Sequence, residues 1–102
     1  MPNALLPAAV AEVLVRLPGW SGDTHGITRT YCFSDFNTAM AFMQAVAPAI
    51  DAANHHPEWS NVYNRVSVTL RTHDAGDRVT ELDVKVARLL DSVAEQSAGQ
   101  AK

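Results

Sequence analysis

An alternating segment in the second half of the chain constrains the fold more than any other feature. In "RVSVTLR", apolar and polar residues alternate from Val66 to Arg71. Successive side chains of a strand point to opposite faces, so this segment predicts a strand with one buried face and one polar face. Residues 58–62 are a second strand candidate, and the two segments predict a hairpin that turns near residues 63–65. Such a hairpin needs other elements to cover its apolar face.

A second pair of strands is predicted nearer the N-terminus. "GITRTYCF" is rich in strand-forming residues, and Ile27, Tyr31 and Phe33 share one face that Arg29 interrupts. A short strand near Trp20 is expected to pair with this segment across "SGDTHG". Because each pair is joined by a short link, we expect one antiparallel sheet of four strands.

Helical periodicity predicts two long segments that can cover this sheet. The first occupies residues 7–17, with a proline in its first turn, and "PG" ends it. The second follows Ser34, the expected N-cap, and its apolar stripe comprises Phe36, Met40, Met43, Ala47 and Ile50. Pro48 lies inside this stripe. We expect a kink or an early stop near residues 46–47, because an interior proline removes a backbone hydrogen bond.

A third helix is expected after Thr80, which forms a capping box with Asp83. Its apolar stripe comprises Leu82, Val86, Leu89 and Val93. The order α-β-β-α-β-β-α predicts an α+β fold, with the helices packed on one face of a four-stranded antiparallel sheet. We expect a single domain over residues 1–102, in which residues 95–102 form a frayed tail.

Composition and charge exclude several classes of function. The formal net charge of the 102 residues is −3, so neither nucleic acid nor a membrane surface is an expected partner. The single cysteine, Cys32, excludes an internal disulfide and fits a reducing compartment. No apolar run approaches the roughly 20 residues that span a bilayer, and the N-terminal segment lacks the basic start of a signal peptide. We therefore expect a cytoplasmic protein.

Three of the four histidines lie at the ends of predicted strands. His55 and His56 are adjacent in "NHHPEW", and His73 follows the alternating strand. The proline after His56 favours an extended backbone, so the two neighbouring rings point in opposite directions and have different tasks. Three hypotheses remain open, namely structural histidines, a zinc site and metal-free acid–base catalysis. The spacing alone names no substrate.

The motif that contains these histidines resembles the pterin-4a-carbinolamine dehydratase family. The matching residues are "DAANHHPEWSNVYNRVSVTLRTHDAG" and, further on, "TELD". "GW" at residues 19–20 and "SDFNTAMAFM" at residues 34–43 also resemble family positions, so the resemblance covers about residues 17 to 90. The family fold has the same order of helices and strands as the order predicted above.

The resemblance implies a dehydratase that uses neither a metal nor a cofactor. It would expel water from 4a-hydroxytetrahydrobiopterin to give the quinonoid dihydropterin, as part of tetrahydrobiopterin recycling. By this resemblance His55 and His73 are the acid–base pair, and which of them is the acid stays open. The same resemblance implies that His56 contacts the pterin and supports catalysis, and that Asp51 orients or charges the histidines.

The resemblance also implies substrate-binding residues, for which we weigh structural alternatives. Asn54, Trp59 and Thr72 are the candidates. The ring of Trp59 either stacks on a pterin or packs as a core or rim aromatic. Asp83 is assigned mainly to its capping box. Trp20 is expected in the core, and His25 in a solvated loop.

The implied partners follow from the family. They are a small-molecule pterin, an aromatic amino acid hydroxylase linked by function, and a second or further copies of the chain in a homodimer or homotetramer. Sheet extension between subunits is expected, because a small antiparallel sheet has unprotected edges and "VSVTL" carries few charges. The alternative function is a non-catalytic module of the same fold, either a transcription-factor dimerisation partner or a Rubisco assembly factor.

Overall fold

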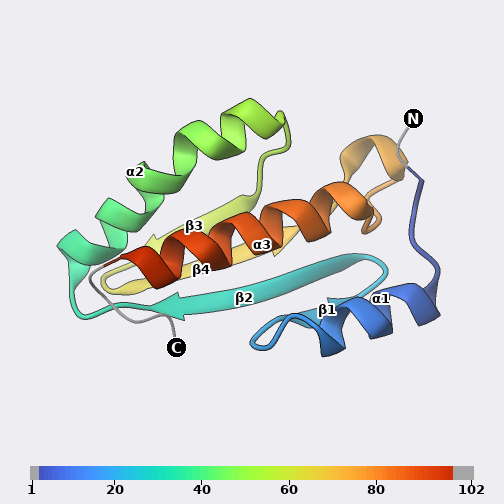
Figure 1. The fold of residues 1–102 in the computed structure, drawn as a ribbon, viewed down its shortest axis with the longest axis horizontal. Coiled ribbons are helices and arrows are strands. Elements are labelled where there is room, and N and C mark those ends of the chain that lie inside the picture. Colours follow the sequence, from blue (N-terminus) through green and yellow to red (C-terminus); the bar gives the residue numbers. More distant parts are fainter. Residues whose placement is uncertain (1–2, 98–102) are drawn as a thin grey trace.

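Helices cover one face of an antiparallel sheet in the computed structural model, which describes residues 3–97 (Figure 1). The elements are α1 (Pro7–Val15), β1 (Ser21–Asp23), β2 (Gly26–Cys32), α2 (Phe36–Ala53), β3 (Glu58–Val62), β4 (Arg65–Leu70), the short 3₁₀ turn η1 (His73–Ala75) and α3 (Glu81–Gln96). The α-β-β-α-β-β-α order and the α+β fold class predicted from the sequence are therefore confirmed. The turn η1 lies in the connection between β4 and α3, for which no helix or strand was predicted.

The four strands lie in the order β1-β2-β4-β3, and every neighbouring pair is antiparallel. The β3–β4 hairpin turns at residues 63–64, within the predicted range, and Tyr63 has a left-handed backbone with φ 52°. The segment "VSVTL" belongs to β4, which lies between β2 and β3 and so has no free edge. The free edges are β1 and β3, so the use of "VSVTL" as evidence for sheet extension was wrong.

The core lies between the sheet and the helices, mainly α2 and α3, and α1 contributes Val10 (Figure 1). Ile27, Tyr31 and Phe33 are buried as predicted, and the interrupting Arg29 is compensated on the same face. The guanidinium of Arg29 lies 2.9 Å from Asp91 of α3, which also accepts hydrogen bonds from the Tyr31 hydroxyl and from the indole of Trp20. This predicted core tryptophan is 5% exposed.

Helix α2 differs from the prediction in three respects. Its N-cap is Asp35 and not Ser34, because the Asp35 carboxylate accepts the Thr38 N–H at 2.8 Å. Its buried face is displaced from the expected stripe and comprises Ala39, Phe42, Val46 and Ile50. It does not stop early but continues through Pro48 to Ala53. Buried residues on both sides of the proline stabilise the helix enough to offset one missing hydrogen bond.

The other two helices differ from the prediction only in detail. Helix α1 ends at Val15, two residues before the expected end, and begins with Pro7 as predicted. The capping box of Thr80 and Asp83 at the start of α3 is confirmed. The buried face of α3 comprises Asp83, Val84, Val86, Ala87, Leu90 and Ala94, whereas the other predicted stripe residues lie at its half-buried margins. Residues 95–96, expected in the tail, belong to α3, and residues 98–102 lie outside the described part.

Within residues 3–97, none of the helices is both long enough and apolar enough to cross a membrane.

Candidate functional site

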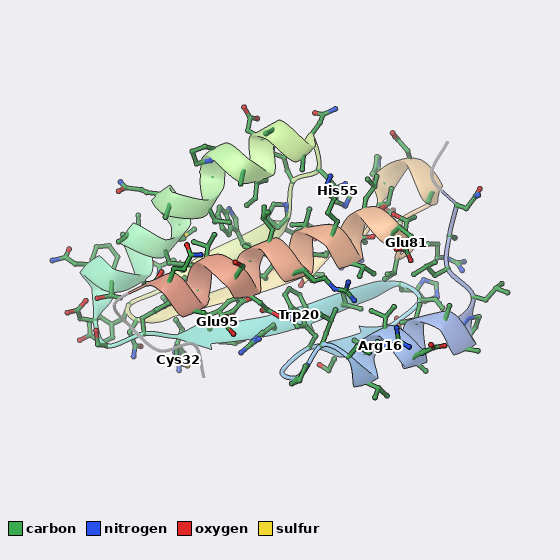
Figure 2. The ribbon with its side chains drawn as sticks, viewed as in Figure 1. Arg16, Trp20, Cys32, His55, Glu81 and Glu95 are labelled. Carbon is green, nitrogen blue, oxygen red and sulfur yellow. The ribbon has the colours of Figure 1, made fainter. Side chains whose placement is uncertain are left out.

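The three motif histidines lie around one end of the β3–β4 hairpin. The pairing of Glu58 with Thr69 places the loop before β3 beside the segment that follows β4. Residues 54–57 form that loop, which is short because Asn54 ends α2 in a left-handed conformation, with φ 53°. Figure 2 shows His55 on this loop, close to the start of α3.

His55 is held by a buried carboxylate. Its Nε2 lies 2.6 Å from Oδ1 of Asp83, and the side chains are 10% and 0% exposed, respectively. Oδ2 of Asp83 accepts the backbone N–H of Thr80 and the hydroxyl of Thr72, each at 2.9 Å. The capping carboxylate of α3 is therefore also the partner of the first motif histidine. Asp83 thus has two roles, of which the sequence pattern predicted mainly the capping one.

The direction of these hydrogen bonds follows from the chemistry of the groups. A carboxylate only accepts, so the single hydroxyl proton of Thr72 goes to Asp83. The Thr80 hydroxyl, 2.6 Å away, then donates to the oxygen of Thr72. Thr72 is 3% exposed, and its hydroxyl donates one hydrogen bond and accepts another within the protein. The substrate contact that the resemblance implies for Thr72 stays a prediction, and the contact seen in the structure is with Asp83.

The second histidine pair is exposed. His56 Nε2 lies 3.1 Å from Oδ1 of Asp51, with side chains 59% and 84% exposed. Asp51 is on the last turn of α2, which continues past Pro48 and so places the carboxylate beside the loop. Asp51 was predicted to orient the histidines generally, but its contact is with His56, whereas Asp83 holds His55.

The third pair involves an aspartate that the sequence analysis did not single out. His73 Nδ1 lies 2.8 Å from Oδ1 of Asp77, in the loop between β4 and α3. The hydrogen bond to Asp77 and the negative charge of Asp77 raise the pKa of His73, which smaller contributions from Asp74 and Glu58 also raise. The side chain of His73 is 90% exposed, so its remaining ring nitrogen faces solvent.

All three rings therefore share one arrangement. One nitrogen of each histidine is bonded to an aspartate, and a carboxylate only accepts. In a neutral ring the proton then resides on the bonded nitrogen, and the lone pair is on the other nitrogen. The nitrogen left for proton exchange is Nδ1 in His55 and His56 and Nε2 in His73.

A cavity of about 530 Å³ adjoins the exposed pair. Its walls comprise Gln44, Ala47, Pro48, Ile50, Asp51, His56, Pro57 and Trp59. The structure thus brings three of the predicted site residues together around one hollow, namely Asp51, His56 and Trp59. His55 and His73 do not line it. They are connected instead through Asp83 and Thr72, the residue before His73.

Three further residues, two from the motif and one outside it, are exposed. Asn54 is exposed at the end of α2. Tyr63 is 62% exposed at the far turn of the hairpin. His25 is exposed in the β1–β2 turn, as expected. Among residues 3–97, no group of three or more His, Cys, Asp or Glu side chains is arranged to hold a metal ion.

Comparison with known proteins identifies the class to which this fold and site belong. The family model for pterin 4 alpha carbinolamine dehydratase matches residues 3–93, and the chain belongs to this family. Two relatives provisionally named pterin-4-alpha-carbinolamine dehydratase come from Opitutus terrae and Rhizobium meliloti. The first is 46% identical over 94 residues, which are 92% of this chain and 97% of the relative. The second is 49% identical over 96 residues, which are 92% of this chain and 91% of the relative.

A solved structure shows the same similarity. It is the crystal structure of a transcriptional coactivator/pterin dehydratase from Brucella melitensis, with a TM-score of 0.85 and 45% sequence identity. The match covers 90% of this chain and 99% of that one. The family resemblance inferred from the histidine motif is therefore confirmed.

Proposed function

We propose that the protein dehydrates a 4a-hydroxytetrahydropterin, such as 4a-hydroxytetrahydrobiopterin, to the quinonoid dihydropterin and water. Membership of the dehydratase family supports the class of reaction. The observation that carries the mechanism is the set of three histidine–aspartate pairs around one end of the β3–β4 hairpin. This reaction needs one group that gives a proton and one that accepts a proton, and imidazole does both near neutral pH.

His55 and His73 transfer the protons in this proposal. A protonated ring gives its proton to the 4a hydroxyl, which then leaves as water. A neutral ring takes the proton from the pterin ring nitrogen as the C=N bond forms. One histidine loses a proton and the other gains one, so the reaction releases one water and no net proton. Exchange with solvent then restores both rings. The Asp83 carboxylate holds His55 in one tautomer, so that Nδ1 is the exchanging nitrogen.

In this proposal the cavity beside the exposed pair holds one end of the pterin, and the reacting edge extends out of the cavity towards His55 and His73, which do not line it. Its volume of about 530 Å³ lies within the usual range for small-ligand sites, roughly 300–1,000 Å³. Trp59 offers a flat apolar surface on which a pterin ring stacks. His56, held by Asp51, supplies a polar contact at the same wall. We assign Thr72 to the support of Asp83, and we retain Asn54 as a contact at the rim.

The direct test is an assay with purified 4a-hydroxytetrahydropterin, followed optically with and without the protein. We expect faster dehydration than in buffer, and the same rate after treatment with a metal chelator. Activity that a chelator abolishes and zinc restores would overturn the metal-free mechanism. A folded sample without activity would favour the alternative, a binding or assembly module, and the Brucella melitensis relative is named a transcriptional coactivator as well as a pterin dehydratase.

Assembly and physiological setting complete the proposal. We place the protein in the cytoplasm, where it serves tetrahydrobiopterin recycling after an aromatic amino acid hydroxylase. We also propose a homodimer or homotetramer in which the exposed edge strand β3 extends the sheet. Light scattering at micromolar concentration should give a multiple of the chain mass, and the mass of one chain would contradict this assembly.

A further inference from the structure

The loop between β4 and α3 has a rigid base beneath His73. The N–H of Thr72 donates to the carbonyl of Arg78 at 2.8 Å, and this bridge closes residues 73–77 into a small ring. Within the ring, the N–H of Gly76 donates to the carbonyl of His73 at 3.0 Å. Thr72 is 3% exposed and bonded to Asp83, so the base of the ring is anchored in the core.

Two successive residues of this ring have left-handed backbones. Gly76 has φ 76° and Asp77 has φ 58°. This region is unfavourable for most side chains but is tolerated by asparagine and aspartate, as well as by glycine. Asp77 combines this left-handed backbone with a side-chain contact. Its carboxylate lies 2.8 Å from Nδ1 of His73.

We propose that Asp77 is a positioning residue for His73, which it holds with Nδ1 towards the loop and Nε2 towards the substrate. The proposal rests on the proton-transfer role of His73 proposed above. Asp77 itself touches no reacting atom. It accepts the Nδ1 proton, so Nε2 is the nitrogen that exchanges a proton with the pterin.

The charges around His73 indicate which of the two catalytic histidines gives a proton and which accepts one. Asp77 makes the largest contribution, Asp74 and Glu58 add smaller ones, and together they raise the pKa of His73. Arg71 lies 3.2 Å from Glu58, so a neighbouring positive charge partly neutralises that carboxylate. A raised pKa keeps more of the ring protonated near neutral pH. The carboxylate that contacts His55, Asp83, already accepts hydrogen bonds from Thr72 and Thr80, whereas Asp77 contacts His73. We therefore assign His73 as the group that gives its Nε2 proton to the leaving hydroxyl, and His55 as the acceptor of the ring-nitrogen proton.

NMR titration of the histidine rings tests the positioning without any substrate. The variants are Asp77→Asn and Asp77→Gly, because both residues tolerate the left-handed backbone and so preserve the loop. Asp74→Asn is the matched control, since it removes one negative charge from the same loop without breaking a hydrogen bond to His73. We expect both Asp77 variants to lower the pKa of His73 more than Asp74→Asn does. The glycine variant should also shift the neutral ring towards the tautomer protonated on Nε2.

The pH profile of the dehydration provides the second measurement. If His73 acts as the acid, the alkaline limb of the turnover profile should move to lower pH in both Asp77 variants. Turnover should fall by less than about 10²-fold because the histidine itself remains, and KM should change little.

The two measurements separate the possible failures. An unchanged His73 pKa and tautomer in both Asp77 variants would overturn the positioning role, whatever the activity. An altered titration in a folded protein without dehydratase activity would support the positioning and contradict the proposed function instead. An active protein whose alkaline limb stays in place would overturn the assignment of His73 as the acid.

Discussion

Two histidine–aspartate pairs of this protein have the same chemistry but opposite surroundings. In the pair of His55 and Asp83 the side chains are 10% and 0% exposed, whereas in the pair of His56 and Asp51 they are 59% and 84% exposed. Asp83 also caps α3 and accepts the Thr72 hydroxyl, but Asp51 has none of these buried bonds. The buried pair is therefore part of the fold, while the exposed pair can change without cost to the core. Mutations in the buried pair should therefore lower stability, whereas mutations in the exposed pair should change catalysis and leave stability nearly unchanged.

The largest effect is expected for Asp83→Ala. The change removes a capping box and leaves His55 and Thr72 without their buried acceptor, so we expect the free energy of unfolding to fall by about 3–5 kcal/mol. Urea denaturation followed by circular dichroism measures this loss. Asp51→Ala is the matched control, because it removes an exposed carboxylate and should change the free energy of unfolding by less than about 0.5 kcal/mol. Equal losses for the two variants would show that burial does not distinguish the pairs.

The next effect divides stability from turnover. His55→Ala and His73→Ala should each lower turnover by roughly 10²–10⁴-fold, the usual range for a positioned acid or base. At about pH 9, where the charge on His73 no longer contributes, only His55→Ala should also lower the free energy of unfolding, by about 1–3 kcal/mol, because it deprives buried Asp83 of a partner. Steady-state kinetics and urea denaturation of the same samples provide both numbers. Folded variants that turn over like the parent would refute the acid–base assignment.

A smaller effect is expected at the exposed pair. His56→Ala should raise KM more than it lowers turnover, because the ring lines the cavity assigned to the pterin. Asp51→Asn should cost less than the loss of His55 or His73, since it only weakens the hold on His56. Saturation curves for both variants measure these changes. A fall in turnover at unchanged KM in His56→Ala would instead make His56 a proton-transferring group.

The smallest effect concerns the pH dependence of stability at the exposed His73–Asp77 pair. Asp77 raises the pKa of His73 above the unfolded value of about 6.5. The stabilisation is therefore fully present below about pH 6.5 and is lost as the pH rises through the folded pKa. Urea midpoints of the parent and Asp77→Asn should differ at about pH 5.5 and coincide at about pH 9. The same difference at both pH values would show that the charge on His73 plays no part.

The fold could be predicted from the sequence because its signals are local. Alternation in residues 66–71 and the capping box of Thr80 each depend on neighbours a few positions apart. The details that failed depend on packing. Ser34 and Asp35 are both capable caps, and only the backbone geometry selects Asp35. Pro48 remains inside α2 because the buried residues on both sides of it stabilise the helix. The sequence shows only the local tendency of proline to end or kink a helix.

The site was only half predictable, for a related reason. The histidines were found because they form a motif, and Asp51 was chosen as their partner because it occupies the acidic position of the family motif that the sequence resembles. The partner of His55 is Asp83, which is 28 residues away in the sequence. The capping box with Thr80 already gave Asp83 a local role, so no second role was predicted. The "TELD" segment in the family motif was the one signal for this second role. Asp77 could not be assigned, because its contact with His73 depends on the left-handed backbones of Gly76 and Asp77, which the sequence does not predict.

The positions of the two tryptophans give the protein its own optical probes. Trp20 is 5% exposed and bonded to Asp91 in the core, whereas Trp59 lines the cavity beside His56. Loss of the core should alter the emission of Trp20, while a molecule that enters the cavity should alter mainly that of Trp59. Replacing one indole at a time with phenylalanine would therefore separate the two fluorescence signals. Ligand occupancy and unfolding could then be followed in two single-tryptophan variants without any added label.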